Sequence, residues 1–117
     1  MRVLVVDFSG KDDLAILLSE NSIAEIKVET NDGGRAYKIA REWQPDIVVF
    51  NLDAKPAHVR RTAMAIIENK SMAHIRLAGV FEQSAPEMGG WPGSMVLSKR
   101  EELNLMINDQ SKHNQHY

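Results

Sequence analysis

Four side chains that could take part in chemistry stand at the ends of short apolar segments. Asp7 and the pair Asn51 and Asp53 each follow a run of four apolar residues, and Lys99 follows a shorter segment. Carboxylate and amide oxygens are ligands for Mg²⁺, and a carboxylate can also act as a nucleophile. The sequence therefore raises the question of whether these residues meet, because sites in open α/β sheets form at the carboxyl ends of the strands.

The apolar segments before these residues predict a parallel sheet. Val3–Val6 and Ile47–Phe50 are uninterrupted, as in strands whose two faces are both covered by helices. Ala24–Thr30 alternates apolar and polar residues and predicts a half-buried strand near the sheet edge. Ile75–Phe81 and Met95–Ser98 are short enough to be two further strands.

Helical periodicity alternates with these strands. Helices are predicted over Asp12–Asn21, Gly34–Trp43, Pro56–Asn69 and Glu101–Asn108, whereas Glu82–Ser94 contains two prolines and three glycines and predicts a loop. We therefore expect one α/β domain, a doubly wound, flavodoxin-like fold. Its five-stranded parallel sheet has the order 2-1-3-4-5, with helices on both faces and a loop in place of the fourth helix.

Composition narrows the function classes. The chain has 117 residues, a formal net charge of −2 and no cysteine, which excludes disulfides and thiolate chemistry. A balanced charge favours neither nucleic acid nor an anionic membrane as a partner, and no apolar run is long enough for a membrane span. We expect a cytoplasmic protein with one domain over residues 1–108 and a polar, disordered tail over 109–117.

Three stretches of the chain resemble the receiver domain of two-component response regulators, over roughly residues 1–108. They are MRVLVVD, NDGGRAYKIAREWQPDIVVFNLD and VLSKREEL. In this family an aspartate at the end of the third strand accepts a phosphoryl group. The matching position, six residues after Pro45, is Asn51. A carboxamide cannot form an acyl phosphate, so the resemblance implies a receiver without its acceptor.

Other positions also lack the residues that the family uses for phosphoryl transfer. Phe8 stands where the family has a second acid for Mg²⁺, and Phe81 stands where it has a Thr or Ser that binds the phosphoryl group. Lys99 matches the family lysine, but Arg100 replaces the proline after it, and the switch aromatic falls near Val96. Together these changes predict a degenerate receiver, a pseudo-receiver that signals without phosphoryl transfer and is not an enzyme.

Several interpretations of the remaining site stay open. The first is a residual polar cluster, in which the Lys99 ammonium faces the Asp7 carboxylate and Asn51 donates and accepts hydrogen bonds. A second is weak Mg²⁺ binding by Asp7, Asp53 and the Asn51 amide oxygen; no other cofactor is expected. A third is phosphorylation of Asp53 as an alternative acceptor with Mg²⁺.

The resemblance also implies partners in a signalling pathway. The predicted module binds proteins without phosphorylation and could form a homodimer through the loop, the fifth strand and the last helix. The candidate contact residues on this surface are Met88, Trp91, Val96 and Arg100. The alternatives are that Trp91 folds back onto the sheet, and that the domain binds a small ligand in the vacated pocket near Asn51, Gly79 and Phe81. A weaker signal is Gly33–Tyr37, which could begin a helix that binds an anion.

Overall fold

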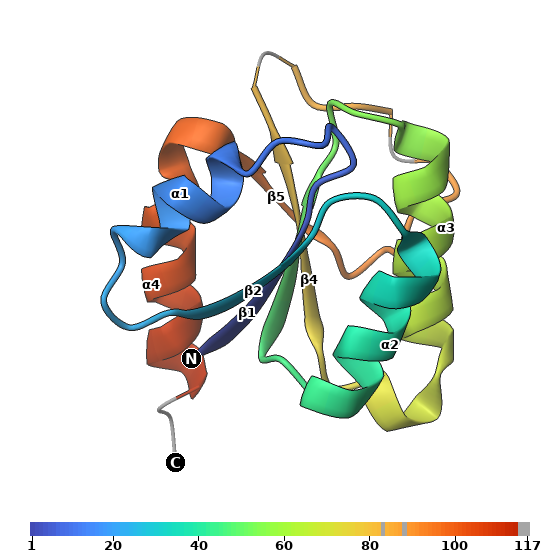
Figure 1. Cartoon of the computed structure of the whole chain (residues 1–117), viewed down its shortest axis with the longest axis horizontal. Helices are drawn as coiled ribbons and strands as arrows, with labels where there is room; N and C mark the ends of the chain where they lie inside the picture. The colour runs from blue at the N-terminus through green and yellow to red at the C-terminus, as the bar shows by residue number, and fades with distance from the viewer. Residues whose placement is uncertain (83, 88, 115–117) are drawn as a thin grey trace.

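A computed structural model describes residues 1–82, 84–87 and 89–114 of the chain. It contains one parallel sheet in the order β2-β1-β3-β4-β5, which confirms the predicted topology (Figure 1). The strands are β1 (Arg2–Val6), β2 (Glu25–Glu29), β3 (Ile47–Asn51), β4 (Arg76–Phe81) and β5 (Val96–Lys99).

The helices lie in two layers, one on each face of the sheet (Figure 1). Four α-helices and two short 3₁₀-helices are formed by the described residues: α1 (Asp13–Ser19), α2 (Gly33–Trp43), α3 (Pro56–Glu68), η1 (Lys70–Met72), η2 (Arg100–Glu102) and α4 (Leu103–Asn114). Helices α1 and α4 cover one face, and α2 and α3 cover the other. Among the described residues, no helix is long and apolar enough to cross a membrane.

The continuous apolar strands are explained by these two layers. Successive side chains of a strand point to opposite faces. Val3 and Val5 therefore pack with α1 and α4, whereas Leu4 and Val6 pack with α2 and α3. All four are fully buried. Each face of the central strands thus has its own core, and both cores fix the position of the strand ends.

The end of the last helix differs from the prediction. The pattern predicts a helix over Glu101–Asn108 and a polar tail from residue 109, but α4 continues to Asn114. Arg76 accounts for part of this extension, because its Nη1 donates to the Gln110 carbonyl oxygen at 3.2 Å and to Oε1 of the same residue at 2.7 Å. The final residues, 115–117, lie outside the described part of the chain.

The segment between β4 and β5 contains no helix among its described residues, 82, 84–87 and 89–95. This agrees with the predicted loop. Gly90 has a φ of +82°, a backbone conformation that L side chains rarely adopt. Trp91 is partly buried and packs against the core beneath α2 and α3. The tryptophan therefore folds back onto the domain, which was one of the two interpretations of this residue.

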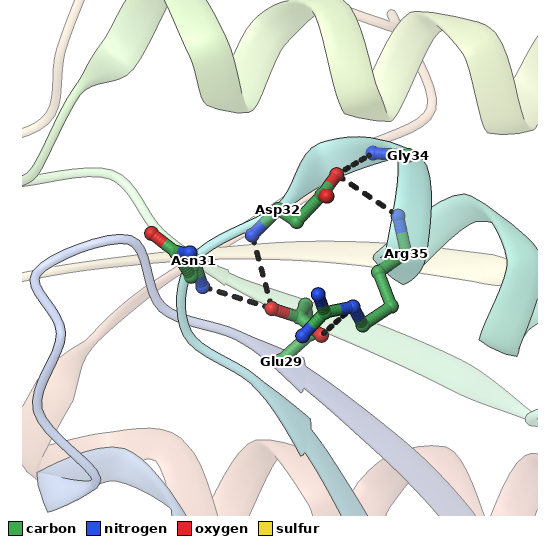
Figure 2. Close-up of polar contacts among 5 residues, drawn as sticks. All are labelled: Glu29, Asn31, Asp32, Gly34 and Arg35. Atoms are coloured by element: carbon green, nitrogen blue, oxygen red, sulfur yellow. Dashed lines mark hydrogen bonds and ion pairs between the residues drawn. The ribbon is translucent and has the colours of Figure 1, made fainter.

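A buried carboxylate organises the connection from β2 to α2 (Figure 2). Glu29 accepts the backbone N–H groups of Asn31 and Asp32, both at 2.9 Å, and pairs with Arg35 at 3.9 Å. Asp32 then caps α2 by accepting the N–H groups of Gly34 and Arg35 at 2.8 and 3.2 Å. These contacts fix the N-terminus of α2 at the carboxyl edge of the sheet.

Candidate functional site

The candidate site lies where β1 and β3 end side by side. In the parallel register Val6 pairs with Phe50, so Asp7 and Asn51 are the next residues of the two strands. Asp7 is 1% exposed and Asn51 is 8% exposed. A buried carboxylate needs hydrogen-bond donors. The groups around Asp7 therefore determine what this site can bind.

Neutral donors bind one oxygen of the Asp7 carboxylate. Its Oδ1 accepts hydrogen bonds from Asn51 Nδ2 at 2.9 Å, from Ser9 Oγ at 2.7 Å and from Ser9 N at 3.1 Å. The other end of the Asn51 amide is also occupied, because Oδ1 accepts the N–H of Asp53 at 2.9 Å. The expected donating and accepting role of Asn51 is confirmed. Ser9 was missed as a partner, although a serine two residues after an aspartate is a typical turn signal.

The orientation of the Asn51 amide follows from its two partners. Turning the group over would place its oxygen against the Asp7 carboxylate and its NH₂ against the N–H of Asp53. The oxygen therefore points away from Asp7. Mg²⁺ needs several oxygens that converge on one point, and this arrangement does not supply them. Among the described residues, no three His, Asp or Glu side chains gather as metal ligands. The Asn51 amide oxygen accepts the N–H of Asp53 and does not complete a magnesium site with Asp7 in this structure. Magnesium binding by Asp7 and Asp53 stays a prediction.

Phe8 stands where the resemblance implies a second acid. The side chain is 2% exposed and belongs to the core beneath α2 and α3. Its ring packs against the imidazole of His58 with centroids 4.1 Å apart and an interplanar angle of 50°. The residue after Asp7 thus carries an apolar ring that packs in the core and cannot ligate a cation.

Phe81 and Asp53 lie at the ends of β4 and β3. Phe81 is buried and offers no hydroxyl. Asp53 Oδ2 accepts the backbone N–H of Glu82 at 2.9 Å, which ties its carboxylate to the residue after β4. The Asp53 carboxylate is exposed, and its bonded partner is neither Asp7 nor Asn51.

The ion pair predicted between Lys99 and Asp7 does not occur among the ion pairs of the described residues. Lys99 is exposed and pairs in register with Phe81 on β4. The order β1-β3-β4-β5 places two strands between Lys99 and Asp7, a separation of roughly 14 Å at the usual strand spacing. Nearby, Arg100 approaches Asp13 of α1 at 3.7 Å.

The vacated pocket proposed near Gly79 is filled by side chains. A Cβ built on Gly79 would come within 2.6 Å of the Leu52 side chain and 3.0 Å of the Met95 sulfur. Both side chains belong to the core. The space directly over Gly79 therefore lacks room for a ligand in this structure.

The proposed partner surface is only partly as predicted. Val96 on β5 is 40% exposed, whereas Trp91 is partly buried and Met88 lies outside the described residues. Two further apolar side chains were missed, Leu97 on β5 at 36% exposure and Leu105 on α4 at 64%. Sequence reasoning could have found Leu105, because it falls outside the buried stripe that contains Leu103 and Ile107.

No protein-family model matches the sequence, and none of the curated proteins matches it significantly. Solved structures do match. The Francisella response regulator 1452 receiver domain superposes with a TM-score of 0.72 at 15% identity, covering 97% of this chain and 98% of that one. The signal receiver domain of a NarL response regulator from Mycobacterium tuberculosis gives 0.69 at 18% identity, covering 95% of both chains.

A LuxR-family DNA-binding response regulator from Staphylococcus aureus gives a TM-score of 0.67 at 20% identity, covering 93% of this chain and 97% of that one. These values define the class by fold: the chain has the fold of response-regulator receiver domains. The likeness extends over nearly the whole chain. By the sequence resemblance, Asn51 is the residue that corresponds to the phosphoryl acceptor.

Proposed function

We propose that this chain is an atypical receiver domain that acts in two-component-type signalling as a protein-interaction module without phosphorylation. One observation carries this proposal: the acceptor position holds Asn51, whose amide is bonded at both ends, to Asp7 and to the N–H of Asp53. An amide is not a phosphoryl acceptor. The module is therefore not an enzyme, and we place it in the cytoplasm.

The hydrogen-bonded cluster of Asp7, Ser9 and Asn51 supports a site that has one conformation when no partner is bound. In a phosphorylated receiver the charge of the site changes on modification, whereas here Asp7 Oδ1 accepts hydrogen bonds from two neutral residues, Asn51 and Ser9. Phe8 after β1 and Phe81 at the end of β4 add buried apolar surface. Signalling through such a domain depends on whether a partner is bound, rather than on the state of the cluster.

The partner surface is the sheet edge formed by β5 together with α4, and its exposed apolar side chains, called the apolar strip, are Val96 and Leu105 on the α4 side and Leu97 on the other face of β5. β5 is an edge strand, and these three side chains are 40%, 64% and 36% exposed. Exposed Lys99 and Glu102 border the strip with opposite charges. A surface that carries both signs can pair with its own two-fold copy, so a homodimer is the proposed assembly.

A mass measurement tests the absence of phosphorylation. The protein is incubated with acetyl phosphate and Mg²⁺, and its intact mass is recorded beside that of an ordinary receiver domain treated in the same way. We expect a phosphoryl gain only in the ordinary receiver. A gain in this protein that disappears in Asp53→Ala would overturn the proposal and identify Asp53 as the acceptor.

Light scattering after size-exclusion chromatography tests the assembly. Leu105→Glu should shift a concentration-dependent dimer to monomer, because it places a charge in the apolar strip. Ile16→Glu is the matched control: Ile16 is 57% exposed on α1, outside the strip. A monomer at all concentrations, or equal effects of the two variants, would contradict the homodimer.

A further inference from the structure

A groove runs between the N-terminal halves of α2 and α3, which lie side by side on one face of the sheet (Figure 1). It consists of two adjoining hollows of about 430 and 520 Å³ that share His58 and Arg61. One hollow extends past Gly33 toward Tyr37, and the other extends to Lys55. Each hollow is as large as a typical small-molecule site.

The second hollow is positively charged. Lys55 and Arg61 line it, and among the described residues no carboxylate lines either hollow. Asp32 lies in the sequence between Asn31 and Gly33, which line the two hollows, and its carboxylate accepts the N–H groups of Gly34 and Arg35. The cationic side chains of this hollow therefore face a space that lacks a lining counter-charge, and such a space favours an anion.

His58 supplies a directed donor between the two hollows. Arg61 Nη2 approaches His58 Nδ1 at 3.4 Å, and a guanidinium can only donate, so Nδ1 is the acceptor of this pair. The ring proton of the neutral imidazole is then on Nε2, which faces the N-terminus of α2: it lies 3.3 Å from a Cβ built on Gly33. Packing against Phe8 fixes the ring in this position.

The first hollow is mostly apolar. Its walls include Tyr37 and Ala65, and the Tyr37 hydroxyl accepts a hydrogen bond from Asn69 Nδ2 at 2.6 Å, which holds the phenol in place. A Cβ built on Gly33 would come 2.5 Å from Thr62 Oγ1, so only a glycine allows α2 to pack this closely against α3. The two helices therefore lie close together at the bottom of the groove. An apolar ring fits this part of the groove better than a charged group does.

We propose that this groove binds a small organic anion, with its phosphate group beside Lys55, His58 and Arg61 and its apolar ring directed toward Tyr37. The site is separate from the cluster of Asp7 and Asn51. It goes beyond the proposed function and does not depend on it. The sequence Gly33–Tyr37 alone is weak evidence for an anion site. The side chains that α3 adds to the groove are what make this a specific proposal.

Phenyl phosphate is the probe that combines both features, and its binding is followed by backbone amide NMR shifts. Inorganic phosphate and phenol each carry only one feature. We expect saturable shifts for residues of α2 and α3 with phenyl phosphate, and at least tenfold weaker binding of the other two probes. Arg61→Ala should weaken phenyl phosphate binding about tenfold, because a charge-assisted hydrogen bond is lost.

Arg60→Ala is the matched control, since Arg60 is the neighbouring exposed arginine on α3 and lines neither hollow. It should leave the affinity within twofold of the unchanged protein. Shifts that fail to saturate, equal affinities of the three probes, or equal losses in the two arginine variants would each overturn the proposal. None of these results bears on phosphorylation of the domain, so the two proposals fail separately.

Discussion

The substitution Asn51→Asp is the sharpest perturbation of the polar cluster. It changes one NH₂ group to an oxygen and leaves the side-chain shape almost unchanged. Asn51 Nδ2 now donates to Asp7 Oδ1 at 2.9 Å, so the substitution replaces a hydrogen bond by two carboxylate oxygens in contact. An ordinary receiver keeps such carboxylates together with a metal ion, but here Phe8 stands where the resemblance implies a second acid.

The cost of this substitution has an upper limit. At a separation of 2.9 Å and an effective dielectric constant of about 20, two unit charges repel by about 6 kcal/mol. The introduced carboxyl can avoid this repulsion by taking up a proton, which costs about 4 kcal/mol at pH 7 for a group whose unfolded-state pKa is about 3.9. The protonated group can then donate to Asp7, as the amide does. We therefore expect a loss of about 4 kcal/mol at pH 7.

The sign of the pH dependence follows from the same argument. The introduced carboxyl has a raised pKa in the folded state, so the folded protein binds a proton that the unfolded chain releases above about pH 4. The loss of stability should therefore decrease to about 1.5 kcal/mol at pH 5 and nearly vanish at pH 4.

Urea unfolding at pH 5 and pH 7, in the absence of divalent cations, measures both values. Asn31→Asp is the control, because Asn31 is exposed at the same edge of the sheet and should change stability by no more than about 0.5 kcal/mol. A loss below about 1 kcal/mol at pH 7, or equal losses at the two pH values, would refute the buried contact between positions 51 and 7.

Three further substitutions test single contacts. Ser9→Ala removes the hydroxyl donor to Asp7 and should lower the free energy of unfolding by about 1–2 kcal/mol, measured in urea; an unchanged midpoint would contradict this contact. Asp32→Ala removes the cap of α2 and should cost about 1 kcal/mol, most of which Asp32→Asn should restore; equal stability of the two variants would count against the cap. Gly79→Val forces a side chain against Leu52 and should cost about 1–3 kcal/mol in thermal or urea unfolding, and a stabilised variant would indicate free space there.

The fold was largely predictable because its strongest signals are local. Val3–Val6 and Ile47–Phe50 are apolar at every position, and only a sheet covered on both faces buries such runs. Short connections and right-handed crossovers then leave few strand orders. The loop between β4 and β5 was predictable for a local reason as well, since its prolines and glycines cannot sustain a helix.

The details that were missed depend on residues far apart in the sequence. The length of α4 depends in part on Arg76, which binds Gln110 from a strand 34 residues earlier. The polar segment after Asn108 carries no local sign of that contact. Similarly, the contact of Phe8 with His58 brings a β1 loop and the first turn of α3 together, and no periodicity reports it.

The candidate site was predictable in its members but not in its pairing. Asp7 and Asn51 meet, as parallel strands that end at one edge require. Lys99 does not join them, because two strands separate it from Asp7, and the donors to Asp7 Oδ1 are neutral groups of Asn51 and Ser9. The residue types of Asp7 and Asn51 indicate that these side chains need hydrogen-bond partners when they are buried. Only the structure shows which residues those partners are.

The most direct test of the account is a titration with Mg²⁺ and beryllofluoride, followed by backbone amide NMR shifts and by the fluorescence of Trp43 and Trp91. Beryllofluoride imitates a phosphoryl group only where a carboxylate acceptor and a metal ion are both held. The account predicts no saturable change at the ends of β1 and β3. A saturable, Mg²⁺-dependent change at Asp7, Asn51 or Asp53 would contradict it and show that the site still accepts a phosphoryl group.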